Sequence, residues 1–234
     1  MAKEVIVKAD TIKNRKKRVK NTKIVISVLF ILLAFLFVLL SLVYKGGRFT
    51  VTLDKRFAMD NNIVLYEDKD FKEVKRKLSA RELEFMDNIS INWIPSDIDS
   101  YNGSHNGENY IAYTFYMENE GEQTVNYWYS VIIDDVIKNV DEAARVMIYF
   151  NGNKSVYAKV NSYTKEPEKD TFPFFNENTA VLEQRKDFKP GDIDKFTVVI
   201  WLEGDDEDCT DNILGGEIKM HMEIREEYKD EKSK

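Results

Sequence analysis

The apolar and polar positions of the chain follow two different patterns on either side of residue 43. Residues 24–43, IVISVLFILLAFLFVLLSLV, contain no charged side chain. An apolar run of about 20 residues matches the length that a helix needs to cross the hydrocarbon core of a bilayer. The pattern predicts a transmembrane helix over residues 24–44, with Tyr44 and Lys45 at the membrane interface.

Beyond residue 45, apolar and polar side chains alternate with the period of two that is typical of half-buried β-strands. The alternation is found in residues 109–118, 124–134, 145–160, 190–204 and 216–224, and further candidate strands lie at 48–54, 63–67 and 85–94. About nine strands are therefore expected. The side chains expected to face the core are Ile111, Tyr113, Phe115, Met117, Val125, Tyr127, Tyr129, Val131, Ile133, Phe196, Val198, Ile200, Leu202, Ile218, Met220, Met222 and Ile224.

Turn residues separate these strands and predict two hairpins. One is expected around residues 119–122 (Asn-Glu-Gly-Glu) and the other around residues 151–153, where Asn-Gly is a favoured hairpin dipeptide. Residues 68–78 and 139–145 resemble short helices, and residues 161–178, with two prolines, resemble a loop. Together these features predict a mainly β fold: a single N-terminal transmembrane helix followed by an antiparallel, jelly-roll-like β-sandwich with one or two short helices.

The charge distribution divides the chain in the same way. Residues 1–23 carry nine Lys/Arg and two acids, a formal charge of +7, whereas residues 45–234 carry 25 Lys/Arg and 39 Asp/Glu, a formal charge of −14. By the positive-inside rule the basic flank stays in the cytoplasm. We therefore expect a basic cytoplasmic tail (1–23), a transmembrane signal anchor (24–44) and an extracellular sandwich domain (45–234) in the cell membrane.

The alternative for the apolar run is a cleavable signal peptide. Apolar regions of signal peptides are about 7–15 residues long and are followed by a small-x-small cleavage site. Here the run is longer and YKGGR follows it. The sequence therefore favours an anchor that is retained, and a mature N-terminus near Gly46 or Gly47 would indicate the alternative.

The charges and the single cysteine also limit the partners. The basic tail lies next to the membrane span, which favours binding to anionic lipid headgroups, and the acidic domain argues against nucleic acid as a partner. Self-association or an envelope protein partner fits a surface domain. Cys209 is the only cysteine of the chain. It cannot form an internal disulfide, so a free or shielded thiol is expected.

The sequence contains no recognisable catalytic motif. A zinc protease of the H-E-x-x-H type needs two histidines four residues apart, but the two histidines, His105 and His221, are far apart. There is no G-x-S-x-G, and Cys209 has no activating base near it in the sequence. No catalytic residue is therefore predicted.

The densest run of carboxylates is the one candidate metal site. Six acids lie in the nine residues from Glu203 to Asp211. Counted from Asp206, oxygen-bearing residues fall at positions 1, 3, 5 and 7, and Glu217 falls at position 12, as in an EF-hand, but position 6 is Asp211 instead of glycine. Asp206, Asp208 and Glu217 are thus candidate calcium ligands. The alternative is a solvated acidic connection between two strands, in which Cys209 is the residue that turns inward.

Three segments carry a resemblance to known proteins: SHNGENYIAYTFYMENEGEQTVNYWY, KNVDEAARVMIYFNG and FKPGDIDKFTVVIWLEGDDEDCTDNILGGEIKM. They resemble a family of membrane-anchored surface proteins of Gram-positive bacteria. More distantly, FTVVIWLEG resembles the camelysin and TasA group of secreted biofilm-matrix proteins. That resemblance implies a jelly-roll sandwich and, in the TasA branch, fibre assembly. The long anchor departs from that group and puts release and fibre formation in doubt.

These features suggest three functions. The first is a non-enzymatic cell-surface protein with a binding or assembly role at the cell envelope. The second is an envelope-located, metal-dependent hydrolase or protease like camelysin, although no residue here matches a zinc-protease motif. The third is an accessory subunit of a membrane sensor, which would need a partner because the tail of 23 residues is too short for a signalling domain.

The asymmetry of charge across the apolar run yields a test of topology. Protease added to intact protoplasts should remove the domain beyond residue 46 and leave the basic tail, because the positive flank stays inside. An antibody against the tail and one against the C-terminus would follow the two parts. Protection of the whole chain would show the opposite orientation.

Overall fold

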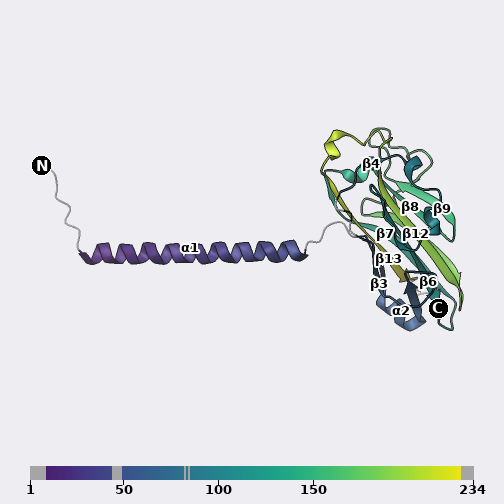
Figure 1. Ribbon diagram of the computed structural model, residues 1–234, viewed down its shortest axis with the longest axis horizontal. Coiled ribbons are helices and arrows are strands. Elements are labelled where there is room, and N and C mark those ends of the chain that lie inside the picture. Colours follow the sequence, from purple (N-terminus) through teal and green to yellow (C-terminus); the bar gives the residue numbers. More distant parts are fainter. Residues whose placement is uncertain (1–8, 44–48, 82, 84, 228–234) are drawn as a thin grey trace, which may run out of the picture. The chain divides into compact units, whose positions relative to one another are not determined.

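The structure is a computed structural model that describes residues 9–43, 49–81, 83 and 85–227. The chain divides into two compact units, Met1–Lys45 and Gly46–Lys234. Figure 1 shows a helix in the first unit and a β-rich domain in the second.

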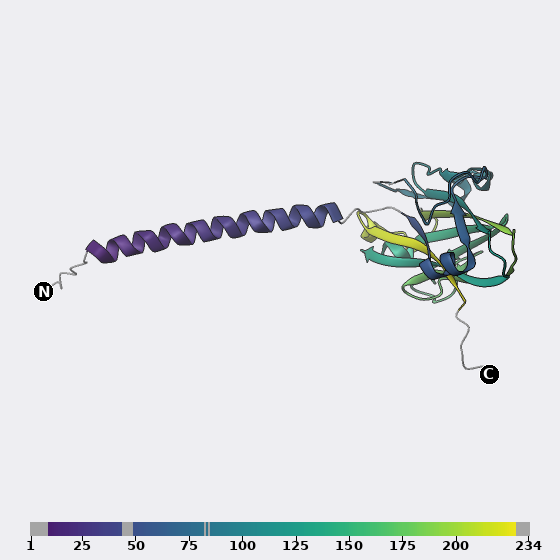
Figure 2. The same cartoon turned by 90° about the horizontal axis from the view of Figure 1, so that it is seen from below.

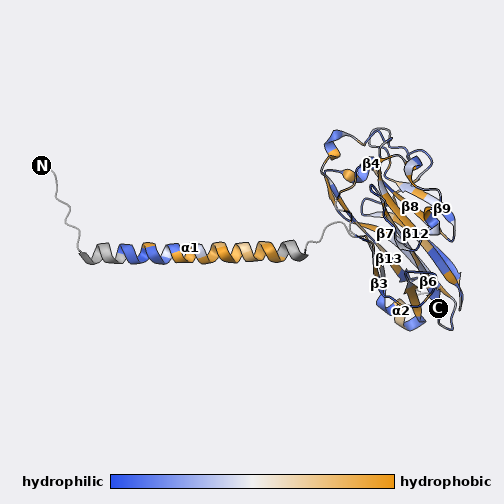
Figure 3. Cartoon of the chain, in the orientation of Figure 1, coloured by the Kyte–Doolittle hydropathy of each residue, from blue (hydrophilic) through white to orange (hydrophobic). Residues whose placement is uncertain are grey.

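The first unit contains one long helix, α1 (Ala9–Val43). The sequence of α1 has no Gly or Pro, so nothing interrupts the hydrogen-bond ladder. Its segment Arg15–Leu39 has a mean hydropathy of 2.8, and every side chain described in that segment is exposed. Figure 3 shows the hydrophilic first part of this segment and its hydrophobic second part. The predicted apolar helix is confirmed, and its length and composition suit a signal anchor or a signal peptide.

The second unit contains two mixed, largely antiparallel sheets. The first sheet has the order β11 (Thr179–Phe188), β7 (Val125–Ile137), β13 (Glu217–Glu226), β1 (Thr50–Leu53) and β3 (Lys77–Ser79). The second has the order β10 (Phe172–Pro173), β9 (Asn153–Ala158), β8 (Ala144–Phe150), β12 (Ile193–Glu203), β6 (Ile111–Asn119) and β2 (Ile63–Tyr66). In addition, β4 (Asn88–Ile89) pairs with β12, and β5 (Gly103–Ser104) pairs with β6. The pairs β1 with β13, β4 with β12 and β9 with β10 are parallel.

The two sheets form a sandwich around a common apolar core, as the sequence predicts. Figure 2 shows the strands of this domain in layers. All the side chains that the alternation predicts to face inward belong to this core or pack against it. Ring stacking adds specific contacts, since the ring of Phe196 lies 5.0 Å from the rings of both Phe115 and Phe150. The predicted β-sandwich is therefore confirmed.

The outer face of the second sheet is covered by the segment that leads into β6. Short 3-10 helices, η1 (Ile91–Trp93) and η2 (Ile98–Ser100), form part of this cover. A second apolar cluster joins Ile94 and Ile98 of the cover to Val199 and Trp201 of β12. Asp99 fixes the cover through hydrogen bonds, because it accepts one from Thr197 at 2.6 Å. Strand β12 is thus buried on both faces.

One predicted hairpin is confirmed and the other is wrong. Strands β8 and β9 form the hairpin around Asn151-Gly152, where φ is +50° and +80°. In contrast, β6 pairs within the second sheet and β7 within the first, so the turn after β6 crosses between the sheets. The alternation of apolar and polar side chains is the same whether two strands pair in one sheet or face each other across a sandwich. The pattern alone therefore could not distinguish a hairpin at residues 119–122 from a crossing between the sheets.

The helices also differ from the sequence-based expectations. Residues 68–78 are not helical, because Phe71 takes a positive φ of 50° and packs edge-on against Tyr66 and Tyr116. Only η3 (Val140–Glu142) is helical within residues 139–145. Helix α2 (Lys55–Asn61) was not predicted, although Asp54 caps it by accepting a hydrogen bond from Phe57. The candidate strand 85–94 is reduced to β4, and residues 161–178 form the expected loop apart from β10.

A buried polar bridge joins the two sheets at Asp194 of β12, which is only 2% exposed. The hydroxyl of Tyr127 on β7 donates a hydrogen bond to Asp194 at 2.6 Å, and Nε of Arg185 on β11 donates another at 3.2 Å. Asn151 donates a third at 2.7 Å. Burial, and then the negative charge of Asp194, raise the pKa of the Tyr127 hydroxyl far above its usual value. Arg185 places a positive charge beside the Asp194 carboxylate, and the bridge therefore joins three strands.

Replacing this carboxylate tests the bridge. Asp194→Ala removes the acceptor of the buried Tyr127 hydroxyl and one of the two carboxylates that pair with Arg185, which costs about 1–3 kcal/mol of the free energy of unfolding. Both core clusters lie between Phe49 and Ile224, so we expect fragment 46–234 to fold by itself and to suit urea unfolding. Asp60→Asn on the exposed face of α2 is the control, expected within about 0.5 kcal/mol of the parent. Equal losses in the two variants would contradict a stabilising bridge.

Candidate functional site

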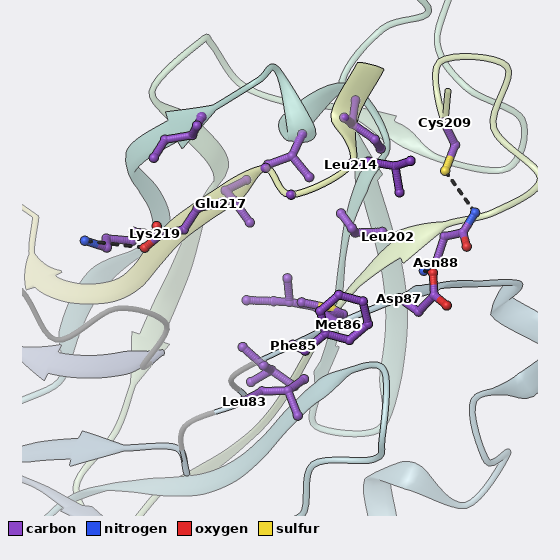
Figure 4. A pocket seen from close by; sticks show the side chains of 18 of the residues that line it. Leu83, Phe85, Met86, Asp87, Asn88, Leu202, Cys209, Leu214, Glu217 and Lys219 are labelled. Carbon is purple, nitrogen blue, oxygen red and sulfur yellow. Dashed lines mark hydrogen bonds and ion pairs between the residues drawn. The ribbon is translucent and has the colours of Figure 1, made fainter. Parts of the chain in front are cut away.

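An apolar cavity of about 640 Å³ lies at one end of the sandwich, between the two sheets (Figure 4). Ile200 and Leu202 of β12 line it from the second sheet, and Ile218 and Met220 of β13 line it from the first. The other apolar side chains of the wall are Phe49, Leu83, Phe85, Met86, Ile111, Ile137, Val140, Ile213 and Leu214. Ligand sites for small molecules have volumes of about 300–1,000 Å³ and mostly apolar walls, so this cavity has the size and character of one.

The floor of the cavity is continuous with the main core, and its mouth reaches the surface. Ile111, Ile200 and Met220 belong to the buried core cluster. Phe85 is 72% exposed and Leu214 is 63% exposed, although both line the cavity. Large apolar side chains at the mouth of a concave apolar surface are typical of a binding site.

The loop between β12 and β13 forms one wall. It contains the short 3-10 helix η4 (Asp211–Ile213) and then Gly215 and Gly216. A Cβ atom at Gly216 would lie only 2.7 Å from the carbonyl oxygen of Ile137, at the end of β7. The absence of a side chain at this position thus lets the loop lie directly against the first sheet and close the wall.

Polar side chains occupy exposed positions of the described wall, such as Asp87, and half-buried ones, such as Glu217 and Lys219. Asp87 and Asp211 are exposed, and Glu217 forms an ion pair of 3.6 Å with Lys219. Cys209 is a free, half-buried thiol, as expected, and the amide of Asn88 donates a hydrogen bond of 3.2 Å to its sulfur. This arrangement can hold an apolar group against the floor while a polar group stays in water.

The acidic run that follows β12 contributes to a second, separate cluster. Carboxylate oxygens of Asp206, Asp208 and Glu168 lie within 4.8 Å of one another. The predicted ligands Asp206 and Asp208 are therefore brought together, and Glu168 from the 161–178 loop joins them. Glu217, the third predicted ligand, lines the apolar cavity instead.

Protein groups bind most of the carboxylate oxygens of this cluster, but Oε1 of Glu168 is buried and has no hydrogen-bond partner in the described part of the chain. Arg145 on β8 donates a hydrogen bond to Asp206 and lies 3.8 Å from Glu168. The hydroxyl and the backbone N–H of Ser162 both donate to Asp208, the latter at 2.8 Å. The guanidinium of Arg145 thus supplies the positive charge that a calcium ion would otherwise supply.

Burial of Asp206 and Asp208 departs from the alternative of a fully solvated acidic connection, although Asp205, Glu207 and Asp211 of the same run are exposed. Asp206 is 7% exposed and Asp208 is 8% exposed, whereas Cys209 is half-buried. Glu203 is also buried, where it accepts hydrogen bonds from the Trp201 indole at 3.0 Å and from the backbone N–H of Ile91 at 3.1 Å. Asp206, Asp208 and Glu203 turn inward because hydrogen-bond donors from three other segments lie next to them. The sequence alone does not reveal those donors.

The two histidines have structural partners. The ring of His105 is within hydrogen-bond distance of the backbone oxygens of Gly103 and Ile98, at 2.9 and 3.1 Å. Nδ1 of His221 lies 2.8 Å from the carboxylate of Asp134. Neither histidine lines the cavity, and neither belongs to the acidic cluster.

Sequence reasoning did not find the cavity, because its wall comes from at least five separate segments. The only local signal is the juxtaposition of exposed apolar residues with a Gly-Gly turn, as in ILGG (213–216). Arg145 and Glu168 were missed for the same reason, since Arg145 is 61 residues from Asp206 along the chain.

Comparisons with known proteins do not identify a family. No family model matches the chain, and no curated protein matches it. Among solved structures, a β-glucosidase from Kluyveromyces marxianus in complex with glucose matches with a TM-score of 0.27 and 11% sequence identity. The match covers 72% of this chain and 16% of that chain, so this chain spans a small part of the glucosidase. A likeness of this degree carries no functional argument.

The role of Arg145 yields a test with calcium. Arg145→Met removes the counter-charge of the buried Asp206 and the half-buried Glu168 and should lower the free energy of unfolding by about 3–5 kcal/mol. Calcium in excess should then raise the melting temperature of the variant, because the three carboxylates become available to a cation. In wild-type protein, where Arg145 fills that role, we expect no such rise.

Arg76→Met, which removes an exposed positive charge next to β3, is the control and should behave like the wild type. An equal rise in the melting temperature of wild type and Arg145→Met would show that calcium binds without displacing the guanidinium. It would then support the predicted calcium site.

Proposed function

We propose that this chain is a single-pass, membrane-anchored protein of the cell surface whose β-sandwich is a non-enzymatic binding domain. The apolar segment of α1 anchors the chain in the membrane, with the basic tail in the cytoplasm against anionic lipid headgroups. The domain lies outside the cell and binds an apolar or amphipathic ligand in the cavity. The resemblance to surface proteins of Gram-positive bacteria supports the same location.

The observation that carries this proposal is the cavity itself. Its volume of about 640 Å³, its apolar floor and the exposed apolar residues at its mouth suit binding. Among the residues that the structure describes, the ionisable side chains of its wall are Asp87, Asp211, Glu217, Lys219 and Cys209. They offer no histidine base and no nucleophile with an activating partner, so a catalytic role has less support than a binding role.

Assembly through added strands also has less support than binding. Edge strands invite pairing with another chain unless they are short or charged. Here β10, β2 and β3 are two to four residues long, and Lys75 already pairs with Leu65 beside β2. The longer edge strand β11 carries the charged run EQRKD. These edges resist open-ended strand addition, which disfavours a fibre built in that way.

An apolar fluorescent probe tests the proposed binding. Anilinonaphthalene sulfonate should bind to folded fragment 46–234 and gain fluorescence, since the cavity excludes water from an aromatic probe. Leu202→Trp should reduce this signal, because Leu202 lines the cavity and the larger indole occupies it. Bound probe should also slow the reaction of the Cys209 thiol with a maleimide.

Leu182→Trp is the matched control, because Leu182 is half-buried on β11 and does not line the cavity. Cooperative urea unfolding must be preserved in both variants, so that probe binding reports on the folded domain. Equal probe binding by the two variants, with no protection of Cys209, would refute the proposal.

A further inference from the structure

We infer that the cavity takes up one acyl chain of a phospholipid from the membrane in which the protein is anchored. This inference rests on the proposed function, because it names the ligand class of the same cavity. Three features of the molecule support it: the short tether, the apolar depth of the cavity and the position of its polar groups.

The length of the chain limits how far the wall of the cavity can lie from the end of the apolar helix. Residues 44–48 alone separate Val43, the last residue of α1, from Phe49, which lines the cavity. Six peptide units extend over at most about 20 Å, so Phe49 stays within that distance of the end of the apolar helix. Phospholipid is the apolar molecule of highest concentration within that reach.

The apolar floor of the cavity suits an acyl chain better than a peptide, because the two ligands differ in their need for hydrogen bonds. An acyl chain has no hydrogen-bonding group, and the floor of Ile111, Ile200 and Met220 offers none from its side chains. A buried peptide segment would need partners for its own N–H and C=O groups, which such a floor does not supply. The apolar depth therefore favours hydrocarbon.

The mouth fits the polar end of the same lipid. Phe85 and Leu214 are exposed apolar side chains that would contact the first methylene groups. The exposed carboxylates of Asp87 and Asp211, also part of the wall, keep the mouth hydrated, and their negative charge favours a zwitterionic headgroup, whose ammonium can approach them, over an anionic one. A flat interface between two copies of the domain would leave the concave floor unfilled, so a second copy is a poorer occupant.

Photo-crosslinking in vesicles tests the inference on the full chain. The protein is reconstituted into phosphatidylcholine and phosphatidylglycerol vesicles that contain a trace of phosphatidylcholine with a diazirine at the end of one acyl chain. After irradiation, peptide mapping should find the lipid on α1 and also on cavity residues such as Met86, Leu202 or Ile218. Leu202→Trp should lose the cavity adducts and keep those on α1, whereas Leu182→Trp should keep both.

Two outcomes would overturn the inference. One is lipid adducts confined to α1 in the wild type, and the other is cavity adducts that persist unchanged in Leu202→Trp. If the soluble fragment still binds anilinonaphthalene sulfonate through the cavity, the proposed binding function survives and only the membrane lipid is excluded as ligand. Crosslinks between cavity residues of two copies, with no lipid adduct there, would assign the cavity to self-association.

Discussion

The burial of β12 on both faces is the constraint on which most of this domain depends. One face places Phe196 and Val198 in the core between the sheets, and the other packs Val199 and Trp201 under the covering segment. Strand β12 also pairs with β6, β8 and β4. Its backbone is therefore hydrogen-bonded to a neighbouring strand on both sides along most of its length. The same strand carries Asp194 at one end and leads into the cavity and the acidic cluster at the other. Its position therefore fixes the core, the polar bridge and the candidate site together.

The inward-facing side chains were predictable from sequence, but the neighbours of each strand were not. Alternation depends only on the pleat of a single strand, so the sets on β6, β7, β12 and β13 were assigned correctly. Pairing depends on contacts that are distant along the chain, and the turn after β6 crosses to the other sheet. At residue 71, tertiary ring contacts override a helical pattern. Asp54 is a favoured capping residue, and it is the local sequence signal for α2.

The candidate site was predictable only in part, for a related reason. The acidic run marked Asp206 and Asp208, and the structure brings them together. The acidic run did not reveal that Arg145 and Ser162 donate hydrogen bonds to these two carboxylates. Those two residues reach the cluster from the β8 and β9 side of the domain. The cavity has no local pattern at all, since its wall is assembled by the topology. A site built from many segments leaves almost no trace in any one of them.

The use of tyrosine hydroxyls to join the sheets limits the alkaline range of this fold. Tyr127 donates to Asp194, and Tyr157 of β9 donates to Glu183 of β11 at 3.2 Å, so both pairs connect one sheet to the other. Burial, followed by the charge of Glu183, raises the pKa of Tyr157 to about 12. An unfolded tyrosine titrates near 10, so above that pH the unfolded chain has lost a proton that the folded chain still holds. The stabilisation is thus complete below about pH 10 and disappears as the pH rises through 12. Deprotonation of these phenols therefore removes one contribution to the stability of the sandwich in strongly basic solution.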